Sequence, residues 1–131
     1  MSRERILSFD LGVTTGGAVF NMKGEVLSTA ALTIEQLPKF IVPAEHMVVE
    51  EPLLIWRGKL QEELLDVVRW CQYELSTAYR AVPSEWKPTP YGRTTWVGPN
   101  VSQHERDAVR MGLWYMNEKL KTVSQRSIVW A

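Results

Sequence analysis

The spacing of apolar and polar residues along the first part of the chain is typical of β-strands separated by short turns. Apolar or alternating runs cover residues 5–11, 17–21 and 25–33, and turns at 12–17 and around Gly24 separate them. Strands joined by connections this short pair with the next strand along the chain. The pattern therefore predicts a three-stranded antiparallel meander at the start of the chain.

The middle of the chain changes to a helical period, with one further strand between two helices. Residues 34–41 predict a short helix that Pro38 interrupts or bends, and "HMVVE" at 46–50 predicts a fourth strand ending in a carboxylate. From 58 to 79, apolar residues recur at three- and four-residue spacing, which predicts a long helix. Its apolar surface is wider than one stripe, so it either packs on the sheet alone or also meets a partner subunit.

The last third of the chain predicts a short strand, a loop and a final helix. Residues 80–86 favour a short fifth strand, and residues 87–100 are rich in proline and glycine, as loops are. "SQHE" at 102–105 has the pattern of a capping box, and apolar positions continue from there to Leu120. Three strands, helix, strand, helix, strand and helix, in that order, predict an α/β fold with one mixed sheet flanked by helices.

Length and hydropathy set the broad class of the protein. A chain of 131 residues predicts one domain, 1–131. No apolar run is long enough to span a membrane, and the start "MSRERIL" lacks the apolar core of a signal peptide, so we expect a cytoplasmic protein. The single cysteine, Cys71, cannot form an internal disulfide and is expected in the core.

The net charge gives no sign of a polyanionic partner, but the distribution of charge does. Fifteen basic residues balance fifteen acidic ones, yet no acid lies between Glu85 and Glu105, and none follows Lys119. The first of these segments holds aromatic and basic side chains that either stack on unpaired bases and contact phosphates, or simply occupy a surface loop. These residues are Trp86, Lys87, Tyr91, Arg93 and Trp96.

Three carboxylates and a histidine stand at positions that the predicted elements bring together. Asp10 ends the first strand, Glu50 ends the fourth, and Asp107 lies one helical turn after His104 at the start of the last helix. Each alone has an ordinary interpretation, as a turn residue, a strand end at the surface or a favourable charge at a helix start. If the first and fourth strands are neighbours, the carboxylates meet. Hard divalent cations, which prefer oxygen ligands, would then resolve their repulsion.

Three segments together resemble the motifs of a known family. "ILSFDLGVTTGGAVF" at 6–20, "MVVEEP" at 47–52 and "HERDAVRMGLWY" at 104–115 resemble, in this order, those of the RuvC-like Holliday junction resolvases of the ribonuclease H-like superfamily, particularly the short bacteriophage forms. The resemblance covers nearly the whole chain in element order. It implies a five-stranded mixed sheet, three antiparallel strands followed by two parallel ones, flanked by helices.

The resemblance implies a two-metal nuclease site. Asp10 would bridge two Mg²⁺ or Mn²⁺ ions, Glu50 would ligate one of them, and His104 and Asp107 would complete the site, with His104 either binding metal or transferring a proton. Glu51 is the alternative to Glu50, although strand alternation turns it to the opposite face. The implied reaction is phosphodiester hydrolysis in four-way junctions, forks or flaps, by a homodimer whose interface includes the helix expected over 58–79.

The turn after the first strand is a further candidate for DNA contact. Its glycines leave room for a metal or a phosphate backbone, and its threonines either hydrogen-bond a phosphate or serve the turn itself. The residues concerned are Gly12, Thr14, Thr15, Gly16 and Gly17.

Two other interpretations stay open. The sugar kinase, actin and heat-shock ATPase superfamily also begins with a strand ending in Asp-Leu-Gly and then Thr, where the turn holds ATP phosphates. That fold needs a second similar domain, for which 131 residues leave no room. The other alternative is a resolvase-like module that binds branched DNA without cutting it. The presence of Asp10, Glu50, His104 and Asp107 together argues against this loss of activity.

Overall fold

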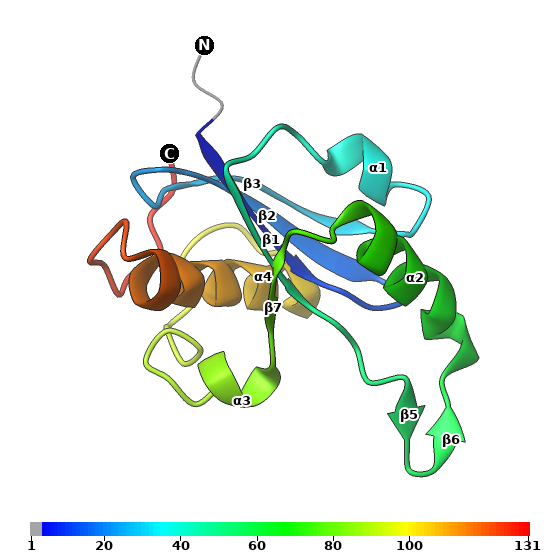
Figure 1. Ribbon diagram of the computed structural model, residues 1–131. Helices are drawn as coiled ribbons and strands as arrows, with labels where there is room; N and C mark the ends of the chain where they lie inside the picture. Colours follow the sequence, from blue (N-terminus) through cyan, green and yellow to red (C-terminus); the bar gives the residue numbers. More distant parts are fainter. Residues whose placement is uncertain (1–3) are drawn as a thin grey trace.

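A three-stranded antiparallel meander forms one half of the central sheet, as predicted (Figure 1). The computed structural model describes residues 4–131. Residues 1–3 lie outside the described residues. They include the predicted start of the domain and part of the segment expected to lack a signal peptide. The turn after the first strand is shorter than expected, because pairing resumes at Thr15. The strands are β1 (Arg5–Asp10), β2 (Thr15–Asn21) and β3 (Val26–Leu32).

Two parallel strands complete the sheet. β4 (His46–Glu50) pairs parallel with β1, and β7 (Tyr79–Ala81) pairs parallel with β4. The strand order is β3-β2-β1-β4-β7. This confirms the predicted α/β class, with three antiparallel strands followed by two parallel ones. It also makes β1 and β4 neighbours, which is the condition for their terminal carboxylates to meet.

Both faces of the sheet are covered, so β1 is apolar on both of its faces. Because side chains alternate along a strand, Ile6 belongs to one core cluster, and Leu7 and Phe9 to the other. All three are fully buried. The helices that cover the two faces are α4 (Gln103–Trp114) on the first, and α1 (Leu37–Phe40) and α2 (Leu65–Glu74) on the second (Figure 1).

The long helix predicted over 58–79 is wrong at both ends. At its C-terminal end, α2 stops at Glu74 and Tyr79 already belongs to β7. Its first part is not helical either. A two-stranded hairpin, β5 (Ile55–Trp56) and β6 (Lys59–Leu60), projects there, followed by a 3₁₀ turn, η1 (Glu62–Leu64), and then α2 (Figure 1). Arg57 and Gly58 both have positive φ, 52° and 77°, which a hairpin turn requires and a helix excludes. Leu60 fits the helical spacing but lies on the exposed hairpin. Cys71, on α2, is fully buried as predicted.

Proline positions explain two smaller differences from prediction. Pro38 does not bend a helix, since it lies in the first turn of the four-residue α1, where a missing N–H breaks no helical hydrogen bond. Pro83 similarly opens a short helix, α3 (Pro83–Trp86), so the strand expected over 80–86 ends at Ala81.

The final helix follows its prediction closely. α4 runs directly into a π-helical segment, η2 (Tyr115–Leu120), and Lys121 then adopts a left-handed conformation with φ 55°. Within residues 4–131, no helix has both the length and the apolar character needed to cross a membrane.

Candidate active site

Asp10 and Glu50 lie side by side at the ends of two parallel strands. They are direct register partners, each at the last position of its strand. Two residues earlier, Ser8 contacts α4 and Val48 belongs to the core cluster on the α4 face. By strand alternation, Asp10 and Glu50 face that same side. The strand geometry therefore directs both carboxylates toward the beginning of α4.

A complete capping box fixes the start of α4, as predicted. The Ser102 hydroxyl accepts a hydrogen bond from the Glu105 N–H at 3.3 Å, and the Glu105 carboxylate accepts one from the Ser102 N–H at 3.0 Å. The Thr29 hydroxyl donates to the other oxygen of Glu105 at 3.0 Å. The cap thus ties the helix start to β3 as well as satisfying its own backbone.

Close backbone contacts hold α4 against the sheet beside Asp10. Gly16 is the register partner of Asp10 on β2, and a Cβ added there would overlap the carbonyl oxygen of His104. One turn further along the helix, the buried Ser8 hydroxyl donates to the Ala108 carbonyl at 2.7 Å. These contacts set the distance between the helix and the strand that carries Asp10.

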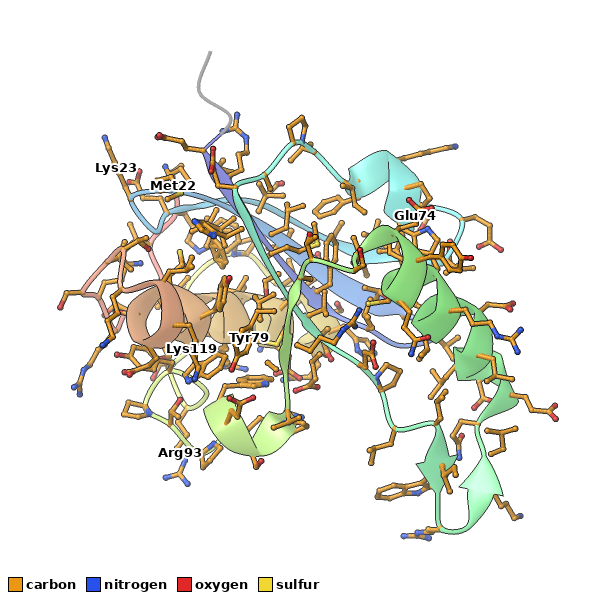
Figure 2. The ribbon with its side chains drawn as sticks, in the orientation of Figure 1. Met22, Lys23, Glu74, Tyr79, Arg93 and Lys119 are labelled. Carbon is orange, nitrogen blue, oxygen red and sulfur yellow. The ribbon has the colours of Figure 1, made fainter. Side chains whose placement is uncertain are left out.

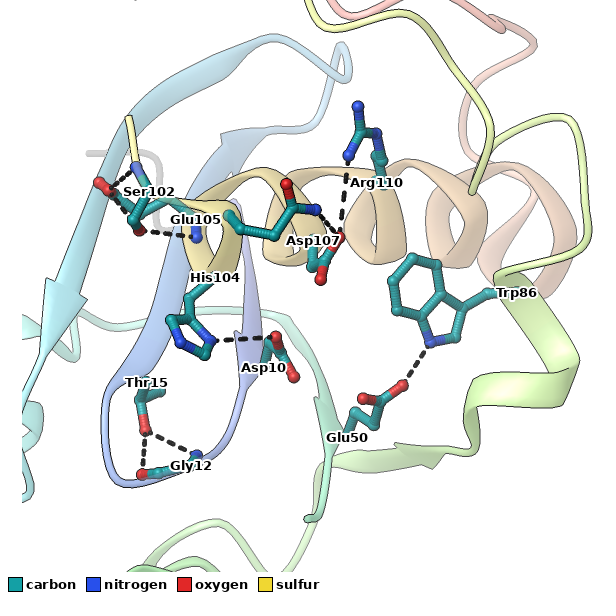
Figure 3. Close-up of polar contacts among 11 residues, drawn as sticks. Asp10, Gly12, Thr15, Glu50, Trp86, Ser102, His104, Glu105, Asp107 and Arg110 are labelled. Atoms are coloured by element: carbon teal, nitrogen blue, oxygen red, sulfur yellow. Dashed lines mark hydrogen bonds and ion pairs between the residues drawn. The ribbon is translucent and has the colours of Figure 1, made fainter. Parts of the chain in front are cut away.

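α4 places a histidine and a carboxylate on the side of Asp10 (Figure 3). His104 Nδ1 lies 3.7 Å from Asp10 Oδ2, and the imidazole is half exposed. Asp107 Oδ1 accepts a hydrogen bond from the Gln103 amide at 2.9 Å and lies 3.8 Å from Nη1 of Arg110. Asp107 is therefore oriented by polar neighbours on its own helix.

Burial and the neighbouring carboxylates together change the protonation of Asp10. Burial, and next the negative charges of Glu50 and Asp107, raise the pKa of Asp10 from 3.8 to about 7, and Lys87 opposes this. The Asp10 side chain is 16% exposed. An ionised Asp10 is thus unfavourable near neutral pH unless a cation lies beside it.

Trp86 has a different role from the one expected of it. Its ring is 1% exposed, and its indole N–H donates to Glu50 Oε1 at 2.7 Å (Figure 3). A tryptophan this deeply buried needs a partner for its N–H, and Glu50 is that partner. The prediction that Trp86 stacks on unpaired bases is therefore wrong for this conformation. The same correction applies to Tyr91, which is 8% exposed.

The alternation that separates Glu50 from Glu51 is present in the structure. Glu51 forms an ion pair with Arg80. The same guanidinium donates to the buried sulfur of Cys71 at 3.2 Å, on the α2 side of the sheet. Glu51 therefore lies with the opposite layer, and Glu50 is the residue beside Asp10.

The turn after β1 is packed mostly against the protein itself. The buried Thr15 hydroxyl lies 3.3 Å from both the N–H and the carbonyl oxygen of Gly12, which stabilises the turn. Gly16 and Gly17 make room for α4 and for the rings of Phe9 and Phe40, which corrects the expectation that they leave space for a phosphate. Val13 and Thr14 are the exposed residues of the turn, and Gly12 is partly exposed.

The remaining predicted DNA contacts lie in the loop after α3. Lys87 and Arg93 are exposed, and Lys87 Nζ lies 5.5 Å from the centroid of the Trp86 ring. Trp96 is half-buried, packs edge-on against Trp130 at 5.9 Å, and has the Arg106 guanidinium over its ring. Only part of the Trp96 ring is therefore open to a ligand.

The oxygen-rich chemistry of the site fits a hard divalent cation. Asp10, Glu50 and Asp107 supply carboxylate oxygens, and burial together with the charges of Glu50 and Asp107 raises the pKa of Asp10. Within residues 4–131, however, no three acidic, histidine or cysteine side chains are already gathered into a metal-binding group. The side chains thus form a cluster of like charge that a cation would draw together.

Comparison with known proteins supports the fold. No protein-family model matches the sequence, and no curated protein matches it. Among solved structures, RuvC from T. thermophilus in complex with a Holliday junction substrate is similar, with a TM-score of 0.60, 16% identity, and coverage of 91% of this chain and 97% of that one. A second structure of Thermus thermophilus RuvC has a TM-score of 0.59 at 16% identity, covering 90% and 97%. The chain thus has the RuvC-like, ribonuclease H-like fold.

Proposed function

We propose that this chain, residues 1–131 as a single domain, is a metal-dependent, structure-specific endodeoxyribonuclease. It would resolve Holliday junctions or cut other branched DNA, as a short RuvC-like resolvase of the bacteriophage type. The observation that carries the proposal is the pairing of Asp10 with Glu50 on adjacent parallel strands, facing the start of α4 and Asp107. Branched DNA as the substrate is supported by the similarity to RuvC captured with a Holliday junction.

Each residue of the site has a proposed task. Asp10, Glu50, Asp107 and His104 would hold two Mg²⁺ or Mn²⁺ ions. When bound, such a pair activates the attacking water and stabilises the leaving oxygen of the phosphodiester. Trp86 keeps Glu50 turned toward Asp10 through its indole N–H. His104, half exposed at 3.7 Å from Asp10, stands where it can ligate metal or transfer a proton to solvent.

DNA would approach from the open side of the cluster. Lys87, whose charge already acts on Asp10, would contact phosphates there, and Arg93 would contact them further along the same loop. Gly12 and the exposed Thr14 would face the scissile strand from the turn after β1. We place this activity in the cytoplasm of a bacterium or of a phage-infected host.

A pair of chains would act together, since a four-way junction has two equivalent strands to cut. α2 supports this, because Tyr73 is 88% exposed and Trp70 lines an apolar hollow of about 360 Å³ beside Met47. We therefore expect light scattering to report twice the 15.1 kDa chain mass. A monomer at every concentration tested would contradict the dimer.

The direct test is cleavage of a labelled four-way junction. Wild type should cut it with Mg²⁺ or Mn²⁺ and not with EDTA. Asp10→Asn and Asp107→Asn should bind the junction without cutting it, and linear duplex and forked DNA show whether branching is required. Glu45→Gln is the matched control and should cut normally, because Glu45 is exposed and stands just before β4, at the opposite end of that strand from Glu50.

The outcomes separate the alternatives. A wild type that binds junctions but never cuts them with either metal would make the chain a binding module. ATP hydrolysis without cleavage would instead favour the phosphate-loop interpretation of the turn after β1.

A further inference from the structure

Two acid-free segments that are far apart in the sequence lie against each other. They are the loop at 87–100 and the C-terminal segment at 121–131. The Trp130 indole N–H donates to the Val97 carbonyl at 2.7 Å, and the Thr94 hydroxyl lies 3.1 Å from the Arg126 carbonyl oxygen. The fold therefore merges two stretches without acidic residues into one surface.

A hollow of about 310 Å³ opens between these segments. It contains two arginines, three hydroxyl-bearing residues and no acid, which is the composition of an anion site. Its lining comprises Arg93, Thr94, Thr95, Val97, Arg126, Ser127 and Ile128.

The two arginines of the hollow have their charges available. Within residues 4–131, neither the Arg93 nor the Arg126 guanidinium forms an ion pair or a side-chain hydrogen bond, and both residues are exposed. Figure 2 shows Arg93 pointing outward from the loop that follows α3. Most other arginines nearby are engaged: Arg110 donates to the Thr94 carbonyl at 3.1 Å, and Arg106 to Asn100.

The hollow is preformed because buried side chains hold both of its walls. Ile128, two residues after Arg126, is 6% exposed in the α4 core cluster. Trp130 packs edge-on against Trp96 at 5.9 Å and forms a parallel bridge with Val26 of β3. A binding site whose walls are already ordered loses little entropy when a ligand arrives.

One side chain links the hollow to the carboxylate cluster. Arg110 Nη1 lies 3.8 Å from Asp107, while its Nε donates to the carbonyl of Thr94, which lines the hollow. The hollow is therefore a surface separate from the carboxylate cluster, and Arg110 contacts both.

We propose that Arg93 and Arg126 form a binding site for the phosphodiester backbone of a DNA arm, outside the centre that holds Asp10. The inference rests on the proposed function, in that the ligand is the DNA whose strand the carboxylate cluster would cut. The guanidinium forks bind phosphate oxygens in pairs, and the hydroxyls of Thr95 and Ser127 add donors. Such a contact does not distinguish one base sequence from another, and its contribution to DNA affinity decreases as the salt concentration rises.

The test is a binding titration with a labelled four-way junction and a linear duplex, in Ca²⁺ to prevent cutting, over salt from about 50 to 200 mM. The double variant Arg93→Gln/Arg126→Gln should lose about 10- to 100-fold in affinity for both DNAs. The slope of its log affinity against log salt concentration should be smaller in magnitude by about 1 to 2, since each neutralised phosphate contributes about 0.9 to that slope. Arg93→Lys/Arg126→Lys should recover the slope.

The matched control removes two positive charges elsewhere. Lys39→Gln/Lys59→Gln changes the net charge equally, at exposed positions on α1 and β6, across the molecule from the loop after α3 and the C-terminal segment (Figure 1). It should leave the slope of wild type unchanged. Thermal unfolding of every variant checks that the substitutions at these exposed positions leave the fold intact.

The result also separates this inference from the proposed nuclease. Unchanged affinity and slope in the Gln double variant overturn the arginine site even if wild type cuts junctions. An equal loss in the lysine control overturns it too, since net charge alone would explain the effect. Wild type that binds junctions but never cuts them with Mg²⁺ or Mn²⁺ refutes the proposed nuclease. The arginine site is then still tested by the salt dependence of binding in the Gln double variant. Wild type that binds no DNA refutes both.

Discussion

Replacing Asp10 by asparagine is expected to make the metal-free protein more stable, although it removes the centre of the proposed site. The folded protein holds the Asp10 proton up to about pH 7, whereas an unfolded chain releases it near 3.8. That interval of about 3 pH units, at about 1.36 kcal/mol each, corresponds to about 4 kcal/mol. The Asp10 carboxylate is coupled to those of Glu50 and Asp107, so part of this energy belongs to all three groups and not to Asp10 alone. We therefore expect a gain of about 2–4 kcal/mol in the free energy of unfolding at pH 8.

The size of the effect depends on pH within a defined window. Between about pH 4 and 7 the native state binds more protons than the unfolded state at Asp10. The stability of wild type therefore falls as pH rises through that window and stays low above it. Asparagine is neutral throughout, so Asp10→Asn should lack this loss, and the two proteins should be nearly equal at pH 4.

Urea unfolding at pH 4, 6 and 8 in EDTA measures the difference directly. At about 4 °C for each kcal/mol, thermal unfolding at pH 8 should show a gain of about 8–16 °C for Asp10→Asn. Magnesium at tenfold its dissociation constant should stabilise wild type by about 1.4 kcal/mol and the variant much less. The exposed Asp66→Asn should change little at any pH. A less stable Asp10→Asn protein at pH 8, with a difference independent of pH, would refute the electrostatic reasoning.

Three further predictions concern neighbours of the site. Trp86→Phe removes the donor to Glu50 and leaves a smaller aromatic ring in its place, so junction cleavage should slow about tenfold. An unchanged cleavage rate in Trp86→Phe would show that Trp86 does not position Glu50 for the reaction. Glu50→Gln should abolish junction cleavage and Glu51→Gln should preserve it. Equal losses of cleavage in the two variants would contradict the assignment of Glu50 to the site. Gly16→Ala should cost about 3 kcal/mol in urea unfolding, because its methyl group meets the backbone of His104.

The strand pattern predicted much of the fold and the placement of the carboxylates. Alternation along "HMVVE" placed Glu50 and Glu51 on opposite faces, and the resemblance favoured Glu50. The apolar run before Asp10 was enough to predict that β1 is a buried strand. The capping box at Ser102 likewise placed the start of α4. These are local signals, in which a few adjacent residues carry all the information.

Features that depend on the backbone conformation of a turn or on distant contacts could not be predicted in this way. Leu60 suits both a helix face and a hairpin, and only the left-handed backbone at Gly58 decides between them. Trp86 stands among prolines and a lysine, so nothing near it in the sequence reveals that its ring is buried against Glu50. Gly16 looks like a turn residue, yet its requirement comes from a helix almost ninety positions later.

The hydrogen bond between Trp86 and Glu50 has a mechanical consequence. Trp86 is the last residue of α3, and the loop carrying Lys87 and Arg93 starts at the next position. When that loop is displaced at its base, the indole must either release the Glu50 carboxylate or pull it along. The orientation of one acidic side chain on β4 is thus coupled to the position of a surface loop, and we expect a ligand that moves the loop to shift that carboxylate as well.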